Sequence, residues 1–378
     1  MEVKLGDVFT ISSGGTPNKN ENSYYDNGTI PWIKTGDLKE KYISNNVGYI
    51  TELGLKNSSA KLFPVNTVLV AMYGATIGAC SILPFEASTN QACAAFLPNK
   101  KVLPEYLYYF LYANKENFIK DGVGGAQPNI SAGYLKKVAF ELKPISEQSE
   151  IVDILDKVKS IIDNRKQQLA KLDELVKARF VEMFGDPETN PKGFKKVLLS
   201  DIAEYFNGLT YSPDNVNSDG TIVLRSSNIQ NSQLDFADTV RVDCPIKEKL
   251  YVKNNDILMC SRNGSARLVG KVALINNLSE PMTFGAFMMI IRSKYYSYLM
   301  TYFQMDAFRK QIAIGATTTI NQITGNMLNK ISLPLPDMAD INEFATFVEQ
   351  VDKSKVAVQK ALDEAQTLFD SLMQQYFG

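Results

Sequence analysis

Histidine is absent from this chain of 378 residues. Its absence excludes Ser-His-Asp and Cys-His nucleophile pairs, zinc sites with histidine ligands, and histidine as a general base. Only four cysteines are present, and none of them has the C-x-x-C spacing typical of metal or redox sites. We therefore interpret Cys80, Cys93, Cys244 and Cys260 as buried, reduced thiols.

Several motifs that carry chemistry are also missing. The chain has no G-x-x-x-x-G-K-[ST] phosphate loop, and the glycine-rich residues 122–125 follow a helix-like segment, not a strand. It has no N-P-P-[FY] string of the kind that holds a target base in amino-methyltransferases, and no P-D…E-x-K pattern of a metal-dependent nuclease. Paired carboxylates such as Asp173-Glu174 are expected on solvated helix faces. The sequence thus predicts a non-catalytic chain without a metal or cofactor of its own.

Long apolar runs and a strong net charge are lacking too. The longest uncharged stretch, residues 62–85, contains Pro64, Gly74, Gly78 and Pro84, and we predict two buried strands around a glycine turn there. Residues 1–15 have no apolar core of a secretory signal. With 40 basic and 41 acidic residues, the net charge of −1 gives no pointer to a partner. We expect a soluble, cytoplasmic protein with no membrane contact.

What the sequence does contain is an internal duplication. The segment Trp32-Ile33-Lys34-Thr35-Gly36-Asp37-Leu38 corresponds to Val223-Leu224-Arg225-Ser226-Ser227-Asn228-Ile229, and from Ile130 to the chain end the offset is constant at 193 residues. Each half begins with short β-type runs and ends with a long segment that contains neither glycine nor proline. Residues 103–120 and 295–314 are predicted as one helix in each half.

The two long segments, residues 146–184 and 339–377, are predicted as helices with the a/d spacing of a coiled coil. The first seam comprises Ile151, Leu155, Val158, Ile162, Leu169, Leu172 and Val176. Its copy comprises Phe344, Val348, Val351, Val358, Leu362, Phe369 and Leu372. The natural partner of each stripe is the other one. Arg165, Arg179 and Lys355 interrupt the seams, either to fix the register or with stems that reach the surface.

Polar loops occupy matching places in both halves, and they carry the side chains that read base edges and hold phosphates. In the first half the candidates are Ser13, Thr16, Lys19, Lys34, Thr35, Tyr73, Thr76, Gln127 and Asn129. In the second half they are Thr210, Tyr211, Arg225, Ser226, Asn228, Arg262, Asn263, Ser265, Arg267, Thr317 and Thr318. The first domain has no arginine, so its lysine and amide side chains would do the reading, and amides favour adenine. Arginines in the second domain favour guanine.

A family resemblance rests on several of these segments. Gly125-Ala126-Gln127-Pro128-Asn129-Ile130-Ser131, followed by Glu147-Gln148-Ser149-Glu150-Ile151, resembles the junction of recognition domain and spacer helix in the specificity (S) subunits of type I restriction-modification systems. Leu5-Gly6-Asp7, Ser13-Gly14-Gly15-Thr16-Pro17 and Gly74-Ala75-Thr76-Ile77-Gly78 are similar as well, and the resemblance covers the whole chain. The second half departs from it, with Asp340-Ile341 in place of Glu147-Gln148.

The resemblance implies an α+β fold with two tandem β-rich target-recognition domains, residues 1–145 and 187–336. Two spacer helices, residues 146–186 and 337–378, would form an antiparallel coiled coil with internal pseudo-twofold symmetry. Each domain would read one half of a split, asymmetric double-stranded DNA target. The helices would set the gap and dock two methyltransferase (M) subunits, to which two restriction (R) subunits can add.

The resemblance also assigns S-adenosylmethionine, ATP and magnesium to the partner subunits. Two alternatives stay open at this point. One is the specificity subunit of a type II system that cuts on both sides of its site. The other is a two-headed coiled-coil adaptor unrelated to DNA.

Overall fold

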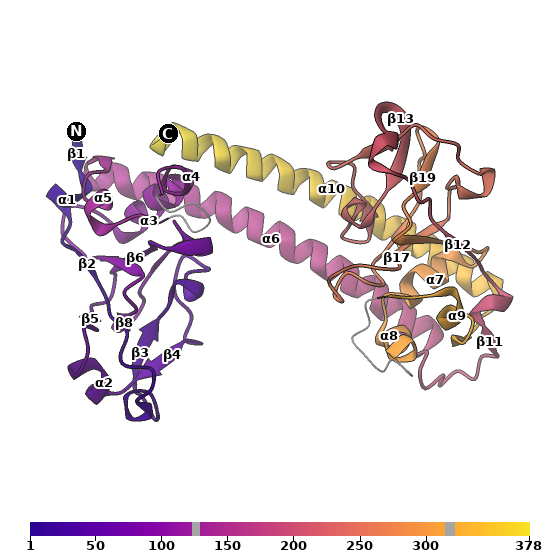
Figure 1. The fold of residues 1–378 in the computed structure, drawn as a ribbon, viewed down its shortest axis with the longest axis horizontal. Coiled ribbons are helices and arrows are strands. Elements are labelled where there is room, and N and C mark those ends of the chain that lie inside the picture. Colours follow the sequence, from indigo (N-terminus) through magenta and orange to yellow (C-terminus); the bar gives the residue numbers. More distant parts are fainter. Residues whose placement is uncertain (123–128, 314–321) are drawn as a thin grey trace. The chain divides into compact units, whose positions relative to one another are not determined.

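The computed structural model describes residues 1–122, 129–313 and 322–378 (Figure 1). Two compact units divide the chain: unit 1 comprises residues 1–166 and 360–378, and unit 2 comprises residues 167–359. Helix α6 (Ile145–Phe184) and helix α10 (Met338–Phe377) have 40 residues each. Each of them therefore begins in one unit and ends in the other, so both units contain parts of both helices.

Unit 1 contains two four-stranded sheets and a short strand pair. The first sheet has the order β2 (Ile11–Ser13), β9 (Cys93–Phe96), β6 (Val68–Ala71), β7 (Cys80–Ile82), and its central strands are fully buried. The second has the order β4 (Gly48–Ile50), β3 (Ile30–Ile33), β8 (Ala87–Thr89), β5 (Leu62–Phe63). Strand β1 (Glu2–Lys4) pairs with β10 (Ala139–Glu141) beside α6. Strands β6 and β7 form an antiparallel pair in the predicted uncharged stretch.

Unit 2 repeats this plan. Its four-stranded sheet has the order β12 (Glu204–Asn207), β20 (Met288–Arg292), β17 (Ile257–Cys260), β18 (Val272–Leu274). A second sheet has the order β16 (Val240–Val242), β13 (Val216–Leu224), β19 (Met282–Phe284). Strand β11 (Lys196–Leu198) pairs with β21 (Ser332–Pro334), and β14 (Ile229–Gln230) with β15 (Gln233–Leu234). The parallel pair β13–β19 repeats the parallel pair β3–β8, which confirms the duplication at the level of topology.

The short helices differ from the prediction of one per half. Residues 103–120 form α3 (Pro104–Ala113) and α4 (Lys115–Lys120). Asn114 separates them, and its side-chain amide donates to the carbonyl of Phe110 at 2.9 Å, which competes with helix continuation. The described part of the second segment, residues 295–313, likewise forms two helices, α7 (Tyr296–Tyr302) and α8 (Asp306–Ala313). The prediction was wrong because helical spacing alone does not reveal such a break.

Part of the predicted seam lies in a shared apolar core within each unit. In unit 1 the seam residues of α6 share one core with Phe369 of α10 and with the aromatic side chains of α3. In unit 2 Val176 of α6 shares a core with Phe344 and Val351 of α10. Partly buried seam residues flank these cores or lie outside them: Leu169, Leu172, Val348, Val358, Leu362 and Leu372.

The charged seam residues Arg179 and Lys355 form ion pairs between the helices of unit 2. The guanidinium of Arg179 lies 2.9 Å from the carboxylate of Glu343, and the ammonium of Lys355 lies 2.7 Å from that of Asp173. The stems of both side chains are mostly covered, and the charges meet at the edge of the seam.

All four cysteines are free thiols. Cys80, Cys93 and Cys260 are buried as predicted, but Cys244 is partly exposed, so the prediction was wrong there. Burial raises the pKa of Cys80 and of Cys93 to about 12, so both stay protonated at neutral pH. Across the described ranges, no helix combines the length and the apolar character needed to cross a membrane.

Candidate nucleic-acid interface

Backbone hydrogen bonds join the polar loops of unit 1 around the turn between β8 and β9. The amide of Gly15 donates to Thr89 O at 2.9 Å, and the amide of Asn90 donates to Ile33 O at 2.9 Å. Met72 bridges two further loops: its amide donates to Ala92 O at 2.8 Å, and its carbonyl accepts from Ile130 N at 2.9 Å. Segments that are far apart in the sequence thus meet in one cluster, which we call the loop junction of unit 1.

Unit 2 has an equivalent loop junction around the turn between β19 and β20. Leu209 N donates to Phe284 O at 2.7 Å, and Gly285 N donates to Leu224 O at 2.9 Å. Ser261 takes the place of Met72, because its amide donates to Phe287 O at 3.0 Å and its carbonyl accepts from Ile323 N at 2.7 Å. Three of the matching loops therefore make equivalent backbone hydrogen bonds in both units, whereas residues 125–128 and 316–319 lie outside the described residues.

A glycine permits the closest backbone approach in each junction. A Cβ atom on Gly14 would lie 2.0 Å from Thr89 O, and one on Gly208 would lie 2.1 Å from Gly285 O. No side chain fits at these distances, so both positions require glycine if the loops are to stay together.

In unit 1 the junction presents basic, amide and aromatic groups. Lys34 is exposed and holds its ammonium 5.1 Å from the ring centroid of Trp32. Tyr73 is 42 % exposed and pairs with the backbone of exposed Asn129. The hydroxyl of Thr16 donates to the side-chain oxygen of Gln91.

The other candidates of unit 1 lie around these groups. Lys19 is exposed, Ser13 and Thr35 are partly buried, and the hydroxyl of Thr76 donates to Tyr73 O at 3.3 Å. Gln127, Thr317 and Thr318 lie outside the described residues.

Two of the candidates in unit 2, Arg225 and Asn228, stabilise the loop that contains them. Arg225 is ion-paired with Asp238 at 2.8 Å, and its backbone amide donates to the side-chain oxygen of Asn228 at 2.8 Å. Asn228 is fully buried, and its amide nitrogen donates to the carbonyls of Asp235 and Asp238. Asn228 therefore shapes the loop and is not accessible to a ligand in this conformation.

The second group in unit 2 is exposed. Arg262, Ser265 and Arg267 are open to solvent, and Asn263 links the loops by donating to the hydroxyl of Ser226 at 3.2 Å. Thr210 is exposed and Tyr211 is partly buried. The junction of unit 2 thus exposes two guanidinium groups, which can bind phosphate or guanine.

The candidate residues include neither Gln322 nor the turn at residues 284–287, although both belong to the junction of unit 2. Gln322 lies 193 residues after Asn129, and it pairs with the backbone of Arg262 as Asn129 pairs with that of Tyr73. The turn at residues 284–287 gave no signal, because an isolated phenylalanine between strands is typical of a buried core residue.

Within unit 1, an ion pair links Lys41 to helix α6. The ammonium of Lys41 lies 2.5 and 2.7 Å from the carboxylate oxygens of Asp156, which also accepts a hydrogen bond from the hydroxyl of Tyr109. Burial, followed by this hydrogen bond, raises the pKa of Tyr109, which keeps its hydroxyl a donor. The equivalent position in α10 is Glu349, which is exposed.

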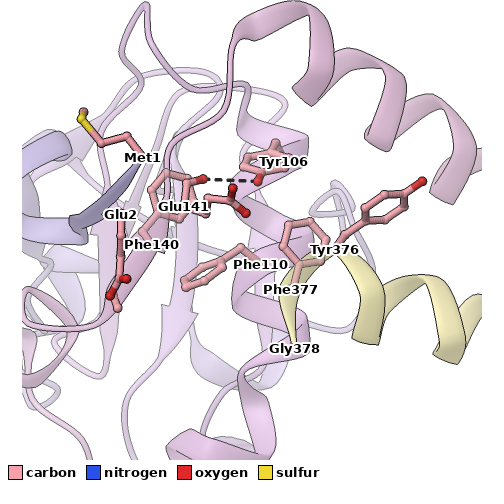
Figure 2. A pocket seen from close by; sticks show the side chains of 10 residues that line it. Met1, Glu2, Tyr106, Phe110, Phe140, Glu141, Tyr376, Phe377 and Gly378 are labelled. Atoms are coloured by element: carbon pink, nitrogen blue, oxygen red, sulfur yellow. Dashed lines mark hydrogen bonds between the residues drawn. The ribbon is translucent and has the colours of Figure 1, made fainter.

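A cavity of about 360 Å³ lies in unit 1, apart from the residues of the loop junction. Figure 2 shows Tyr106, Phe110, Phe140 and Phe377 around it, with Tyr376 extending away from the others. The other residues that line it are Met1, Glu2, Ala139, Glu141 and Gly378. Its charged side chains are carboxylates, which repel phosphate, so the cavity does not belong to the candidate interface.

The family model of the type I restriction modification DNA specificity domain matches residues 1–174 and 191–365, one match in each half. The EcoR124I/EcoR124II specificity subunit of Escherichia coli is 28 % identical over 45 % of this chain and 44 % of its own length. The MjaIX specificity subunit of Methanocaldococcus jannaschii is 31 % identical over 54 % of this chain and 52 % of its own length. This chain therefore spans about half of each of these relatives.

Other similarities extend over the whole chain. The EcoKI specificity subunit of Escherichia coli is 23 % identical over 97 % of this chain and 85 % of its own length. Two solved structures share the fold over 100 % of this chain. One is the S subunit of the type I restriction-modification system from M. genitalium (TM-score 0.56, 14 % identity, 96 % of that chain covered). The other comes from work on complex assembly in the type I R-M system (TM-score 0.60, 16 % identity, 97 % of that chain covered).

Proposed function

This chain belongs to the family of type I restriction modification DNA specificity domains, and we propose that it is the non-catalytic DNA-recognition subunit of such a system. Residues 1–145 and 187–336 act as the two recognition domains. Each binds one half of a split, asymmetric target in double-stranded DNA, and base contacts come from the exposed side chains of its loop junction.

The observation that carries this proposal is that the loop junction occurs twice. Both copies hold equivalent loops with equivalent backbone hydrogen bonds, and both expose basic and amide side chains. Two copies of one polar surface fit duplex DNA with two half-sites. The two half-sites share the same backbone geometry, while their base sequences can differ independently.

The charge of the chain suggests how affinity is shared within a complex. Neutralisation of phosphates supplies most non-specific affinity for DNA, and a net charge of −1 offers little of it. We therefore propose that two methyltransferase (M) subunits, carrying S-adenosylmethionine, enclose the DNA and supply much of the contact with its phosphates. Where restriction (R) subunits are present, they bring ATP and magnesium.

The long helices are the proposed docking surface for the methyltransferase subunits and the spacer that sets the gap. In unit 1, Ile154 and Ile161 of α6 are exposed although the buried seam runs along another face. They are seven residues apart, which is the repeat of a coiled-coil stripe. Leu175 continues this spacing in unit 2, where it is also exposed. A helix of a methyltransferase subunit can pack against this exposed apolar stripe.

The test is co-expression of the tagged chain with the adenine methyltransferase of its source cell, followed by native mass measurement and selection of bound duplexes from a random pool. We expect two methyltransferase copies per chain and a selected target of two short conserved blocks with a fixed gap. A methyltransferase fused to a nuclease would assign the chain to a system that cuts on both sides of its site. Recovery of the chain with partners unrelated to DNA, and no selected duplex, would support the adaptor and overturn the proposal.

A further inference from the structure

Phe287 is the most exposed aromatic side chain among the described residues, with 59 % of its surface open, and it lies in the loop junction of unit 2. A single exposed phenylalanine is common and by itself indicates nothing. The backbone of this one is held firmly, however. Its carbonyl accepts from Ser261 N, from Arg262 N and from the Ser261 hydroxyl at 3.0, 3.1 and 3.0 Å.

Arg262 covers one face of the Phe287 ring. Its guanidinium carbon lies 5.5 Å from the ring centroid, which is within the range of a cation–π contact. Within the described ranges Arg262 forms no ion pair, whereas Arg225, Arg241 and Arg292 each pair with a carboxylate. Arg262 is therefore positioned by an apolar ring and not by an acid, and its five N–H donors remain available.

The pair occurs in one unit only. The backbone hydrogen bonds show that Tyr73 is the counterpart of Arg262 and that Ala92 is the counterpart of Phe287. A side-chain pair needed to hold the junction together would be expected in both copies. Its presence in unit 2 alone indicates a role in what that unit binds.

We propose that Arg262 and Phe287 form a two-base reader for a thymine next to a guanine in the half-site bound by unit 2. Arginine binds O6 and N7 of guanine with two hydrogen bonds, and phenylalanine contacts the 5-methyl group of thymine. The separation of 5.5 Å between guanidinium and ring matches one to two base steps of roughly 3.4 Å each. This inference rests on the proposed function, because it specifies which bases one of the two junctions reads.

The experiment uses the full chain assembled with its methyltransferase and the duplex that the assembly selects. Each thymine of the target is replaced in turn by 2′-deoxyuridine, which removes only the methyl group, and each guanine by 7-deazaguanine, which removes only N7. We expect one uridine in the second half-site to weaken binding about 4-fold and the neighbouring deazaguanine about 10-fold.

Two variants connect these losses to the two side chains. Phe287→Ala should bind the uridine and thymine duplexes equally, and Arg262→Ala should bind the deazaguanine and guanine duplexes equally. The matched control is Phe236→Ala, because Phe236 is another exposed phenylalanine of the same unit, and it should keep both losses. Because the Phe287 ring is exposed, its removal should leave the melting temperature unchanged.

Two results would overturn the inference. One is a half-site of unit 2 without adjacent thymine and guanine. The other is the same uridine loss in the wild type and in Phe287→Ala, as expected for a ring that is a wedge between bases and not a reader of the methyl group. Failure to select any duplex would count against the proposed function itself, so the two failures are distinguishable.

Discussion

The loop junctions of units 1 and 2 share their backbone hydrogen bonds but present different side chains. Where unit 1 has Tyr73 and Ala92, unit 2 has Arg262 and Phe287. The amide side chain persists as Asn129 in one and Gln322 in the other. Because the scaffold uses backbone groups and glycines, the side chains on it can vary without loss of the fold. Under the proposed function, this is how one module reads two different half-sites.

The two units also differ at one buried position directly before a central strand of the four-stranded sheet, β6 in unit 1 and β17 in unit 2. Unit 2 has Asp256, which is 1 % exposed and pairs with Arg292 at 2.6 Å. At the equivalent place unit 1 has buried Thr67, whose hydroxyl donates to Pro64 O at 2.8 Å. Equivalent backbone positions thus carry a neutral hydrogen bond in unit 1 and an ion pair in unit 2. We expect the loss of stability on breaking these two interactions to differ.

The largest expected effect separates these two positions. Asp256→Ala should lower the free energy of unfolding by about 3 kcal/mol, because it leaves the Arg292 guanidinium without its partner in a largely buried place. Thr67→Ala should cost only about 1 kcal/mol, since one neutral hydrogen bond is lost. Chemical denaturation of both variants measures the difference. Equal losses would show that the ion pair contributes no more than the hydroxyl.

The next effect distinguishes the two junctions by function. Gly14→Ala and Gly208→Ala each force a Cβ atom against a carbonyl oxygen, at a cost of about 1–3 kcal/mol of local packing. Duplex selection with each variant should show relaxed preference in one half of the target and unchanged preference in the other. Relaxation of both halves by either variant would mean that the junctions do not act separately.

A smaller effect concerns the attachment of unit 1 to α6. Asp156→Asn should cost about 1 kcal/mol of stability, because it removes the ion pair with Lys41 and weakens the hydrogen bond from Tyr109. Glu349→Gln is the matched control in unit 2, where the equivalent carboxylate is exposed, and it should change nothing measurable. Hydrogen exchange of α3 amides reports the loosening, and unaltered exchange in Asp156→Asn would contradict this account.

The smallest effect lies in the seam. Lys355 occupies the position that Ile162 fills in unit 1, where that side chain is 1 % exposed. Lys355→Ile should change the free energy of unfolding by less than about 1 kcal/mol, because the lost pair with Asp173 is replaced by apolar packing. Thermal unfolding measures it. A loss of several kcal/mol would show that the charge fixes the register of the helices.

Much of this architecture could be predicted from the sequence, and for identifiable reasons. The duplication is visible because both copies kept glycine and asparagine where the backbone demands them, as at Asn66 and Asn255, which both have positive φ. The seam is visible because its period of 3.5 residues continues for the length of a helix. Helix breaks such as Asn114 were missed, since local hydrogen bonds there override the helical spacing.

The candidate site was only partly accessible to sequence reasoning. Loops with polar residues were identified by chemistry, but burial decides what each side chain can do. Asn228 reads as a base-binding amide in the sequence, yet it is fully buried and caps its own loop. Phe287 reads as a core residue, yet its ring is exposed on a turn whose carbonyl is held by hydrogen bonds from Ser261 and Arg262.

The measurement that tests the central claim most directly is an exchange of residues 1–145 for the corresponding domain of another member of the family, followed by duplex selection in the assembled complex. If the two junctions read separate half-sites, one block of the selected target changes while the other block and the gap stay as in the wild type. A target in which both blocks change, or neither does, would contradict the claim.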